Sequence, residues 1–226
     1  MGREKAQAKI EEWFAGVTTS AFEAAVELKL AVGIAEGDYR FKDENERLAV
    51  RDGARRFFDE FSRKVIVLSD GRCAYFAPDV RAKARGVDNA MAWAEYAIHA
   101  VTSSGKMIPG KDYWERLFNP VKLDNLALVE HIIRREDCFA RISDGHPERD
   151  SIIFVGASKE NRRLEVVTRL DEFGNVDADL TEVTVVVTRK KCVETTEPPP
   201  MPLAEVVKTV AQHQAAGFSP STVPLV

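Results

Sequence analysis

Four histidines carry the side chains best suited to acid–base chemistry near neutral pH, and they lie far apart in the sequence. His99 follows Glu95 by four residues, so on a helix the carboxylate would favour the protonated imidazole and fix its tautomer. This arrangement suits a general acid or base. The alternative is a histidine at the boundary of a core that does no more than pair with Glu95.

A second group combines His131 with Arg134 and Arg135 one turn later. An imidazole and a guanidinium on neighbouring turns could hold one phosphate, the arginine through a two-pronged hydrogen bond. The alternative needs no ligand, because the backbone dipole favours cations at a helix C-terminus. His131 and Arg135 therefore form a reserve pair for substrate binding.

Polar and apolar residues alternate in the last two predicted strands. Glu165 and Arg169 share one face of the first, whereas Glu182, Thr184 and Thr188 share one face of the second. If the two polar faces coincide, they form a shallow wall of acid, base and hydroxyl groups. The alternative is the ordinary solvated face of an antiparallel sheet.

The run from Gly105 to Lys111 has the spacing of a phosphate-binding loop, G-x-x-x-x-G-K. However, Asp112 follows where that motif needs Ser or Thr, Pro109 removes an N–H, and a helix is expected where a strand should precede. The chain also lacks H-x-x-x-H, C-x-x-C and G-x-S-x-G patterns. We predict no cofactor and no metal site.

Helical periodicity fills residues 1–63, with Ser20 and Asp43 as expected N-caps. The best-formed helix is predicted over 88–104, between an Asp88 cap and a left-handed Gly105.

Two shorter helices are expected downstream. One lies near 113–118 and is stopped by Asn119-Pro120, and the other follows an Asp124 cap.

A hairpin is predicted from 64–68 and 73–76, and four further strands are expected over 138–142, 152–155, 164–170 and 180–188. The fold class is therefore α+β: a helical N-terminal part, then helices packed on a four-stranded antiparallel sheet.

The predicted division is a helical region over 1–63, an α+β domain over 64–193, and a Pro-rich linker with a short tail over 194–226. A short amphipathic helix is expected over 203–213.

The 226 residues carry a formal charge of −4, so no global basic field attracts nucleic acid. Residues 51–141, with 16 basic and 13 acidic side chains, are the only net-positive third. The three scattered cysteines, the charged N-terminus and the lack of a long apolar run predict a cytoplasmic protein without a membrane segment.

The order of these elements resembles the barnase, EndoU, colicin and RelE class of small ribonucleases, most closely its phage-encoded branch. The residues that carry the resemblance are a helix with His99, a break at Phe118-Asn119-Pro120, a second helix and four strands ending in a Thr-rich run, over about 64–192. The resemblance implies metal-independent RNA cleavage, in which a base activates the 2′-hydroxyl and a cation stabilises the phosphoryl transition state.

On that resemblance, His99 would be the acid or base, Arg169 would stabilise the phosphate, Glu182 would carry a second proton, and Thr184 and Thr188 would orient the substrate. Two departures stand out: little positive charge, and no histidine in the strands. The rival hypothesis is a non-catalytic module from a phage or mobile element that binds a host protein through the Pro-rich linker and apolar tail. The oligomeric state is left open.

Overall fold

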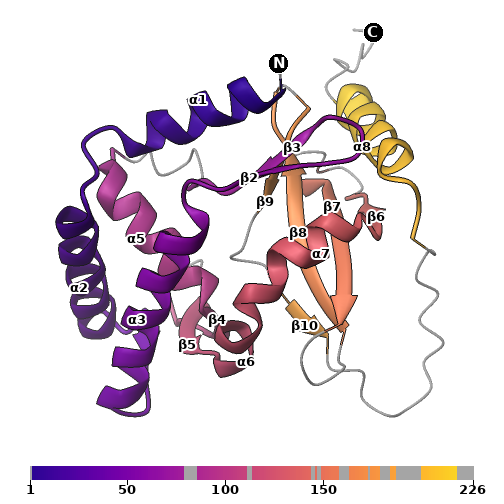
Figure 1. Cartoon of the computed structure of the whole chain (residues 1–226). Coiled ribbons are helices and arrows are strands. Elements are labelled where there is room, and N and C mark those ends of the chain that lie inside the picture. Colours follow the sequence, from indigo (N-terminus) through magenta and orange to yellow (C-terminus); the bar gives the residue numbers. More distant parts are fainter. Residues whose placement is uncertain are drawn as a thin grey trace, which may run out of the picture.

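The computed structural model of the chain has an α+β architecture, as the sequence predicts (Figure 1). Most of the helices lie at one side and the larger sheet lies at the other, with two helices packed beside that sheet. The structure describes residues 2–78, 86–110, 114–143, 146, 149–157, 163–172, 174–178, 184–186 and 200–217.

The helices of the described residues fall into an N-terminal group and a group that packs on the sheets. They are α1 (Gly2–Phe14), α2 (Thr19–Ala35), α3 (Glu44–Phe61), α5 (Asn89–Ala100), α6 (Pro120–Asn125), the 3-10 turn η1 (Leu126–Leu128), α7 (Val129–Arg135) and α8 (Leu203–Gly217).

The strands form two sheets, and each strand is short. They are β1 (Tyr39–Arg40), β2 (Val65–Val67), β3 (Cys73–Tyr75), β4 (Thr102–Met107), β5 (Trp114–Phe118), β6 (Cys138–Arg141), β7 (Ser151–Ala157), β8 (Arg163–Leu170), β9 (Val176–Ala178) and β10 (Thr184–Val186).

The larger sheet has the order β2-β3-β9-β8-β7-β6, with β10 paired to β8 beside β9. The smaller sheet has the order β1-β5-β4 and brings strand β1 from the N-terminal region alongside β5. The predicted hairpin is confirmed as β2 and β3, and β6, β7 and β8 form the predicted antiparallel run.

The predicted four-stranded antiparallel sheet is wrong, because the hairpin joins the same sheet and β3 pairs with β9 in parallel. Asn175, which directly precedes β9, is buried at this junction, and its side-chain oxygen accepts the Cys73 N–H at 3.3 Å. Its side-chain nitrogen donates to the Gly2 carbonyl at 3.3 Å. A short sequence window cannot reveal pairing between segments a hundred residues apart.

The helix caps were predicted in part. Asp43 and Asp88 accept from the N–H groups of Glu46 and Met91, as expected. Thr18 rather than Ser20 caps α2.

The predicted cap at Asp124 is also wrong. Asn119 caps a helix that begins at Pro120, because proline lacks only an N–H that the first turn leaves unbonded anyway.

The predicted helix over 88–104 ends early, at Ala100, and its last residues turn into β4. Residues 114–118, expected to be helical, form β5 because they pair with β4 from Thr102↔Phe118 to Met107↔Trp114. Gly105 therefore lies in a strand and not in a helix cap. Tertiary pairing overrides the weak local preference of these residues.

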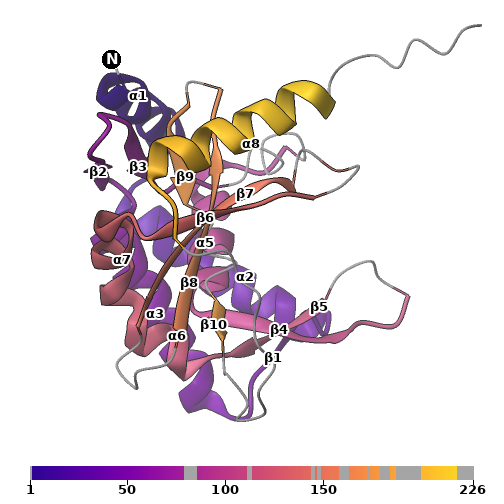
Figure 2. The same ribbon diagram turned by 90° about the vertical axis from the view of Figure 1, so that its right-hand side faces the viewer.

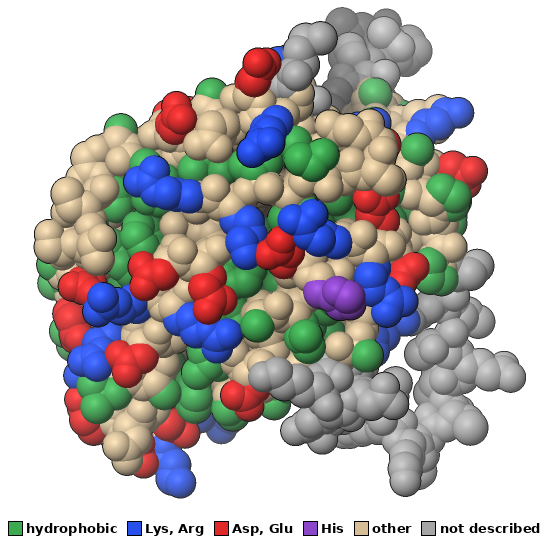
Figure 3. Space-filling model, viewed as in Figure 1, with side chains coloured by type: hydrophobic (Ala, Val, Ile, Leu, Met, Phe, Trp, Pro, Cys, Tyr) green, Lys and Arg blue, Asp and Glu red, His purple; other side chains and the backbone are tan. Residues whose placement is uncertain are grey.

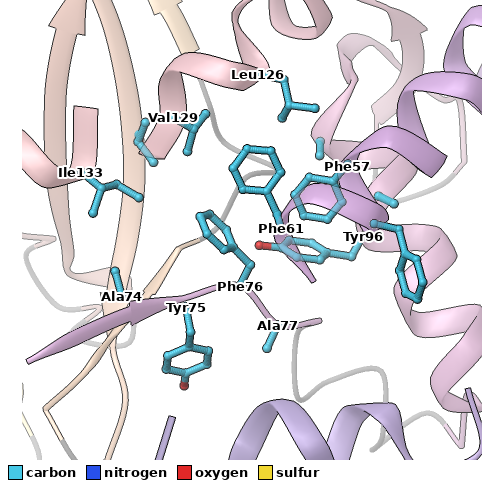
Figure 4. Packing of buried hydrophobic residues seen from close by; sticks show 14 of the residues in the cluster. Phe57, Phe61, Ala74, Tyr75, Phe76, Ala77, Tyr96, Leu126, Val129 and Ile133 are labelled. Atoms are coloured by element: carbon cyan, nitrogen blue, oxygen red, sulfur yellow. The ribbon is translucent and has the colours of Figure 1, made fainter. Parts of the chain in front are cut away.

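One contiguous hydrophobic core joins the N-terminal helices to the sheet and reaches α8. Figure 4 shows Phe57 and Phe61 of α3 packed beside Phe76, with Val129 and Ile133 of α7 approaching from the sheet side. The ring centroids of Phe61 and Phe76 are 5.1 Å apart in an edge-to-face arrangement. Buried residues from all three predicted segments belong to this core, since Val206 and Val210 of α8 are included.

Tyr39 of β1 packs directly on Gly33 of α2. A Cβ atom at Gly33 would lie 2.3 Å from the Tyr39 ring, so the close approach of β1 to α2 requires glycine.

We predict that Gly33→Ala lowers the free energy of unfolding by about 1–3 kcal/mol, although alanine is the better helix former, because overpacking dominates. Urea unfolding measures this. In a Tyr39→Ala background the same change should become neutral or stabilising; an equal loss in both backgrounds would contradict the steric explanation.

Candidate functional site

His99 lies in the last turn of α5, half-buried, on a stripe with Glu95. The carboxylate of Glu95 forms an ion pair with Lys29 of α2 at 3.2 Å. Helix α5 packs against α1, α2, α3 and β4, so His99 belongs to the helical side of the molecule.

The carbonyl groups at the C-terminal end of α5 are bound by two cationic side chains. Lys122 is buried, and its Nζ donates to the carbonyls of His99 at 3.2 Å and Thr102 at 2.9 Å. Arg116 donates to the same two carbonyls, each at 3.2 Å. The His99 carbonyl lies in the last turn of α5, at the negative end of the helix dipole, where cations are favoured, and Thr102 is the first residue of β4.

The remaining donors of Arg116 reach Thr102 Oγ1 and Ser104 Oγ, both at 3.2 Å. Tyr39 lies nearby, and burial, followed by the negative charge of Glu95, raises its pKa. The polar groups around His99 are therefore bound mainly to one another and to backbone. This arrangement fixes the junction of α5 with the small sheet and offers little capacity for a phosphate.

Arg169 lies on the opposite side of β8 from the main core. Val167, two residues away on the same face, belongs to a small separate cluster with Phe139 and Ile153. Glu165 shares that face and is buried, with Arg141 at 3.1 Å and Arg163 at 3.0 Å from its two carboxylate oxygens.

Thr184 of β10 is the partner of Glu165 in the antiparallel backbone register. Glu182 and Thr188 lie outside the described residues.

His131 and Arg135 lie on the exposed side of α7, whose buried side shares the main core with Leu164 and Val166 of β8. Arg135 is held by Asp137 at 2.6 Å. The two residues are thus on the other side of the sheet from Arg169. The structure brings Thr184 and Glu165 together but places His99, Arg169 and His131 in three different layers.

The clearest acid–base pair was missed by the sequence analysis. Asp150 is fully buried, and its Oδ2 lies 2.6 Å from Nδ1 of His213 on α8. Its Oδ1 accepts the backbone N–H of Ser143 at 2.9 Å. In the tautomer that carries its proton on Nδ1, this nitrogen donates to Asp150 Oδ2 and Nε2 is the basic nitrogen of the neutral ring.

This pair has the geometry of an oriented general base. The His213 side chain is about one-third exposed while its carboxylate partner is inaccessible to water. Two further polar residues, His146 and Arg149, are exposed in the same loop as Asp150, and the Arg149 N–H donates to the His146 carbonyl at 2.9 Å. A base, a second imidazole and a cation thus come from one loop and one helix.

Sequence spacing gave little sign of this pair, because 63 residues separate its members. A usable signal was nevertheless present: the apolar positions of 203–213 predict a docked helix, and His213 ends that stripe.

The β4–β5 hairpin is a second candidate site, and Figure 2 shows it extending away from the helices. An extra residue on β4 between Ser104 and Met107 forms a bulge, and the buried Glu115 carboxylate accepts the Lys106 N–H there at 2.9 Å. A Cβ at Gly105 would lie 2.7 Å from the Glu115 side chain, so only glycine fits. The described part of the G-x-x-x-x-G-K run, 105–110, therefore begins within strand β4 of this hairpin and not after the expected helix, and Lys111 lies outside the described residues.

Beyond the bulge, Met107 and Trp114 face each other across the two strands. They are 56% and 49% exposed, so a large apolar pair stands at the outer part of the hairpin. Nothing in the described part of the chain covers this pair.

Two absences concern the described residues only. No three His, Cys, Asp or Glu side chains are grouped as a metal site, and no helix combines the length and apolar character needed to cross a membrane. Comparisons with protein-family models, with curated proteins and with solved structures each found no match.

We predict that Asp150 and His213 together hold α8 on the sheet. Asp150→Asn and His213→Gln should each lower the free energy of unfolding by about 1–3 kcal/mol, since each leaves a buried polar group poorly paired. The double variant should lose clearly less free energy of unfolding than the sum of the two single losses. In each single variant, the amide hydrogen-exchange rate should rise first in α8. Additive losses, or unchanged exchange in α8, would contradict a direct coupling.

Proposed function

We propose that this protein is an interaction module that binds another protein through the β4–β5 hairpin. The observation that carries the proposal is the exposed pair Met107 and Trp114 on a projecting element. Tryptophan, methionine and arginine are enriched at the centres of protein interfaces, where one aromatic anchor can supply several kcal/mol. The partner is expected to offer an apolar pocket.

A nucleic acid is a poorer fit to the same hairpin. Arg40 is paired with Glu115 at 3.4 Å, and Arg116 is engaged at the end of α5. Of the described residues of the two strands, Lys106 is the remaining cation. Figure 3 shows the opposite face of the molecule, from which the hairpin points away, and there basic and acidic side chains are interspersed.

The hairpin is also a better candidate than the Pro-rich linker and C-terminal tail, through which the rival hypothesis of the sequence analysis would bind a host protein. Leu203, Val206 and Val210 of α8 are buried in this chain's own core. Residues 218–226, the rest of that expected tail, lie outside the described part of the structure.

The test is affinity capture with the full chain, in which Trp114→Ala and Met107→Ser are compared with the parent. We expect one stoichiometric partner whose binding falls at least about tenfold in the Trp114 variant, because an anchor of this kind contributes roughly 2 kcal/mol or more. Val67→Ala, at an equally exposed position on β2, is the matched control and should retain the partner. Equal retention by all variants removes this function from the hairpin.

A second candidate function is metal-independent RNA cleavage, and the His213–Asp150 pair favours it. In this proposal Nε2 of His213 removes the proton of the 2′-hydroxyl, whose oxygen attacks the adjacent phosphorus while the 5′-oxygen leaves. Arg149 would stabilise the charged phosphate and His146 would protonate the leaving oxygen. This replaces the expected set of His99 and Arg169, which lie in different layers.

Incubation of a labelled RNA with the protein in EDTA tests this candidate. Cleavage should leave a 2′,3′-cyclic phosphate, and His213→Ala should slow it by about 10²-fold or more. The double variant His99→Ala, Arg169→Ala is the control and should cleave like the parent. If the double variant lost activity and His213→Ala cleaved like the parent, the site expected from the sequence would be supported instead. If the parent protein did not cleave RNA, only the interaction module would remain as a proposed function.

A further inference from the structure

Helix α7 packs on one face of the large sheet, where Ile132 lies against Gly156, and α8 belongs to the same core. The opposite face of the sheet carries an apolar row that crosses three strands. Phe139, Ile153 and Val167 are direct partners in the registers of β6, β7 and β8, and they belong to the small separate cluster. Side chains at every second residue from this row share the same face, and several of them are charged.

Glu165 is a buried acid on this face, and two arginines bind it. Its side chain is 6% exposed, and its two oxygens accept from Nε of Arg163 at 3.0 Å and from Nη2 of Arg141 at 3.1 Å. Arg141 lies on β6 and Glu165 lies on β8, so the arginine side chain reaches across β7 and its apolar stem lies over the row of Ile153 and Val167. A buried carboxylate is costly unless cations bind it, which explains why the two arginines converge here.

The cluster keeps one positive charge after this pairing, because two guanidinium groups share one carboxylate. The Arg141 side chain is 47% exposed. A guanidinium has five N–H donors, and Glu165 accepts at a single nitrogen of Arg141. The guanidinium of Arg163 lies over the Phe139 ring, with 5.5 Å between its central carbon and the ring centroid. Two guanidinium groups from different strands are therefore held side by side, and the one from Arg141 faces solvent.

We propose that this cluster is a phosphate-binding site, in which one phosphate group accepts hydrogen bonds from Arg141 and Arg163 on the outer side of Glu165. Arginine suits phosphate because its planar fork can donate two parallel hydrogen bonds to two oxygens. A tetrahedral phosphate has enough oxygens to bind two guanidinium groups that already share a carboxylate. Glu165 holds the two like charges together before the ligand arrives, so binding costs less side-chain entropy.

The charge of the site favours one phosphate group over a nucleic-acid backbone. Among the described residues of this face, Arg141, Arg163 and Arg169 face two acids, Glu165 and Asp177. Asp177 is the partner of Arg169 in the register of β8 and β9. One positive charge in excess attracts a single anion, whereas a nucleic acid binds along a series of cations.

An apolar side chain lies next to the proposed phosphate position. Val155 of β7 is the partner of Glu165 in the antiparallel register and is partly buried against the small cluster. The apolar part of a small phosphate ester would contact Val155 while its phosphate binds the arginines. The ligand is accordingly a phosphate ion or a small organic phosphate.

The site is separate from both proposed functions. Asp150 precedes Ser151, the partner of Arg141, so its side chain points to the opposite face of the sheet, where His213 of α8 meets it. The hairpin with Trp114 belongs to the small sheet. The phosphate site can therefore be tested independently of the protein partner and of RNA cleavage.

Titration of the full chain with inorganic phosphate at constant ionic strength tests the proposal, with the Nε–H signal of Arg163 followed in NMR spectra. The parent should bind with a dissociation constant on the order of millimolar. Arg141→Gln should raise this constant by about tenfold or more, because it removes hydrogen bonds to a charged group. Arg134→Gln is the matched control and should bind like the parent, since Arg134 is also exposed and also shares a glutamate, Glu130, with a second cation.

A second variant separates the loss of the site from a damaged fold. Glu165→Gln makes the site more positive by one charge, so phosphate binding should strengthen by about threefold or more, whereas a damaged fold would weaken it. Phenyl phosphate identifies the source of the phosphate group. Tighter binding than that of inorganic phosphate indicates an organic phosphate with its apolar part on Val155, and equal binding indicates the free ion.

Four results would overturn the proposal. They are a parent that does not bind phosphate, unchanged binding in Arg141→Gln, an equal loss in Arg134→Gln, and weaker binding in Glu165→Gln.

Discussion

The end of helix α5 is the constraint on which the rest of the arrangement depends. The carbonyls of His99 in its last turn and of Thr102 at the start of β4 lie where the helical layer meets the small sheet. Lys122 from α6 and Arg116 from β5 both donate to these two carbonyls, so one set of hydrogen bonds ties these elements together. The buried Lys122 ammonium is costly unless its hydrogen bonds are made. The need to make these bonds fixes the register of β5 against β4 and the position at which α6 begins.

The requirement that a buried charged group makes its hydrogen bonds also explains two buried carboxylates at the candidate sites. Glu115 is bound by the N–H of the bulge in β4, and Asp150 is bound by Ser143 and His213. In the first case the carboxylate shapes the hairpin that presents Met107 and Trp114. In the second it orients an imidazole that is about one-third exposed. Polar groups inside the fold are thus satisfied in ways that expose specific side chains at its surface.

The surface divides between apolar and mixed-charge regions. The exposed pair on the hairpin and the exposed apolar residues of α2 belong to different sides of the fold, one group on the small sheet and the other on the helical layer. The charges near both are paired within the chain, as in Arg40–Glu115 and Arg55–Glu23. This pattern is typical of protein contacts, where apolar anchors supply affinity and paired charges supply specificity. It agrees better with an interaction module than with a surface that follows a polyanion.

By itself, the sequence determined the α+β class, the caps at Asp43 and Asp88, the hairpin of β2 and β3, the run from β6 to β8 and the presence of a helix that begins at Leu203. These features depend on side-chain periodicity and on capping groups that act within a few residues. Only the tertiary structure decided that 102–107 and 114–118 are paired strands, that β9 joins β3 in parallel, and that Asp150 meets His213. Sequence spacing could not show that His99, Arg169 and His131 lie in separate layers. Their positions depend on packing between segments that are far apart in the chain, and local residue patterns carry no information about such contacts.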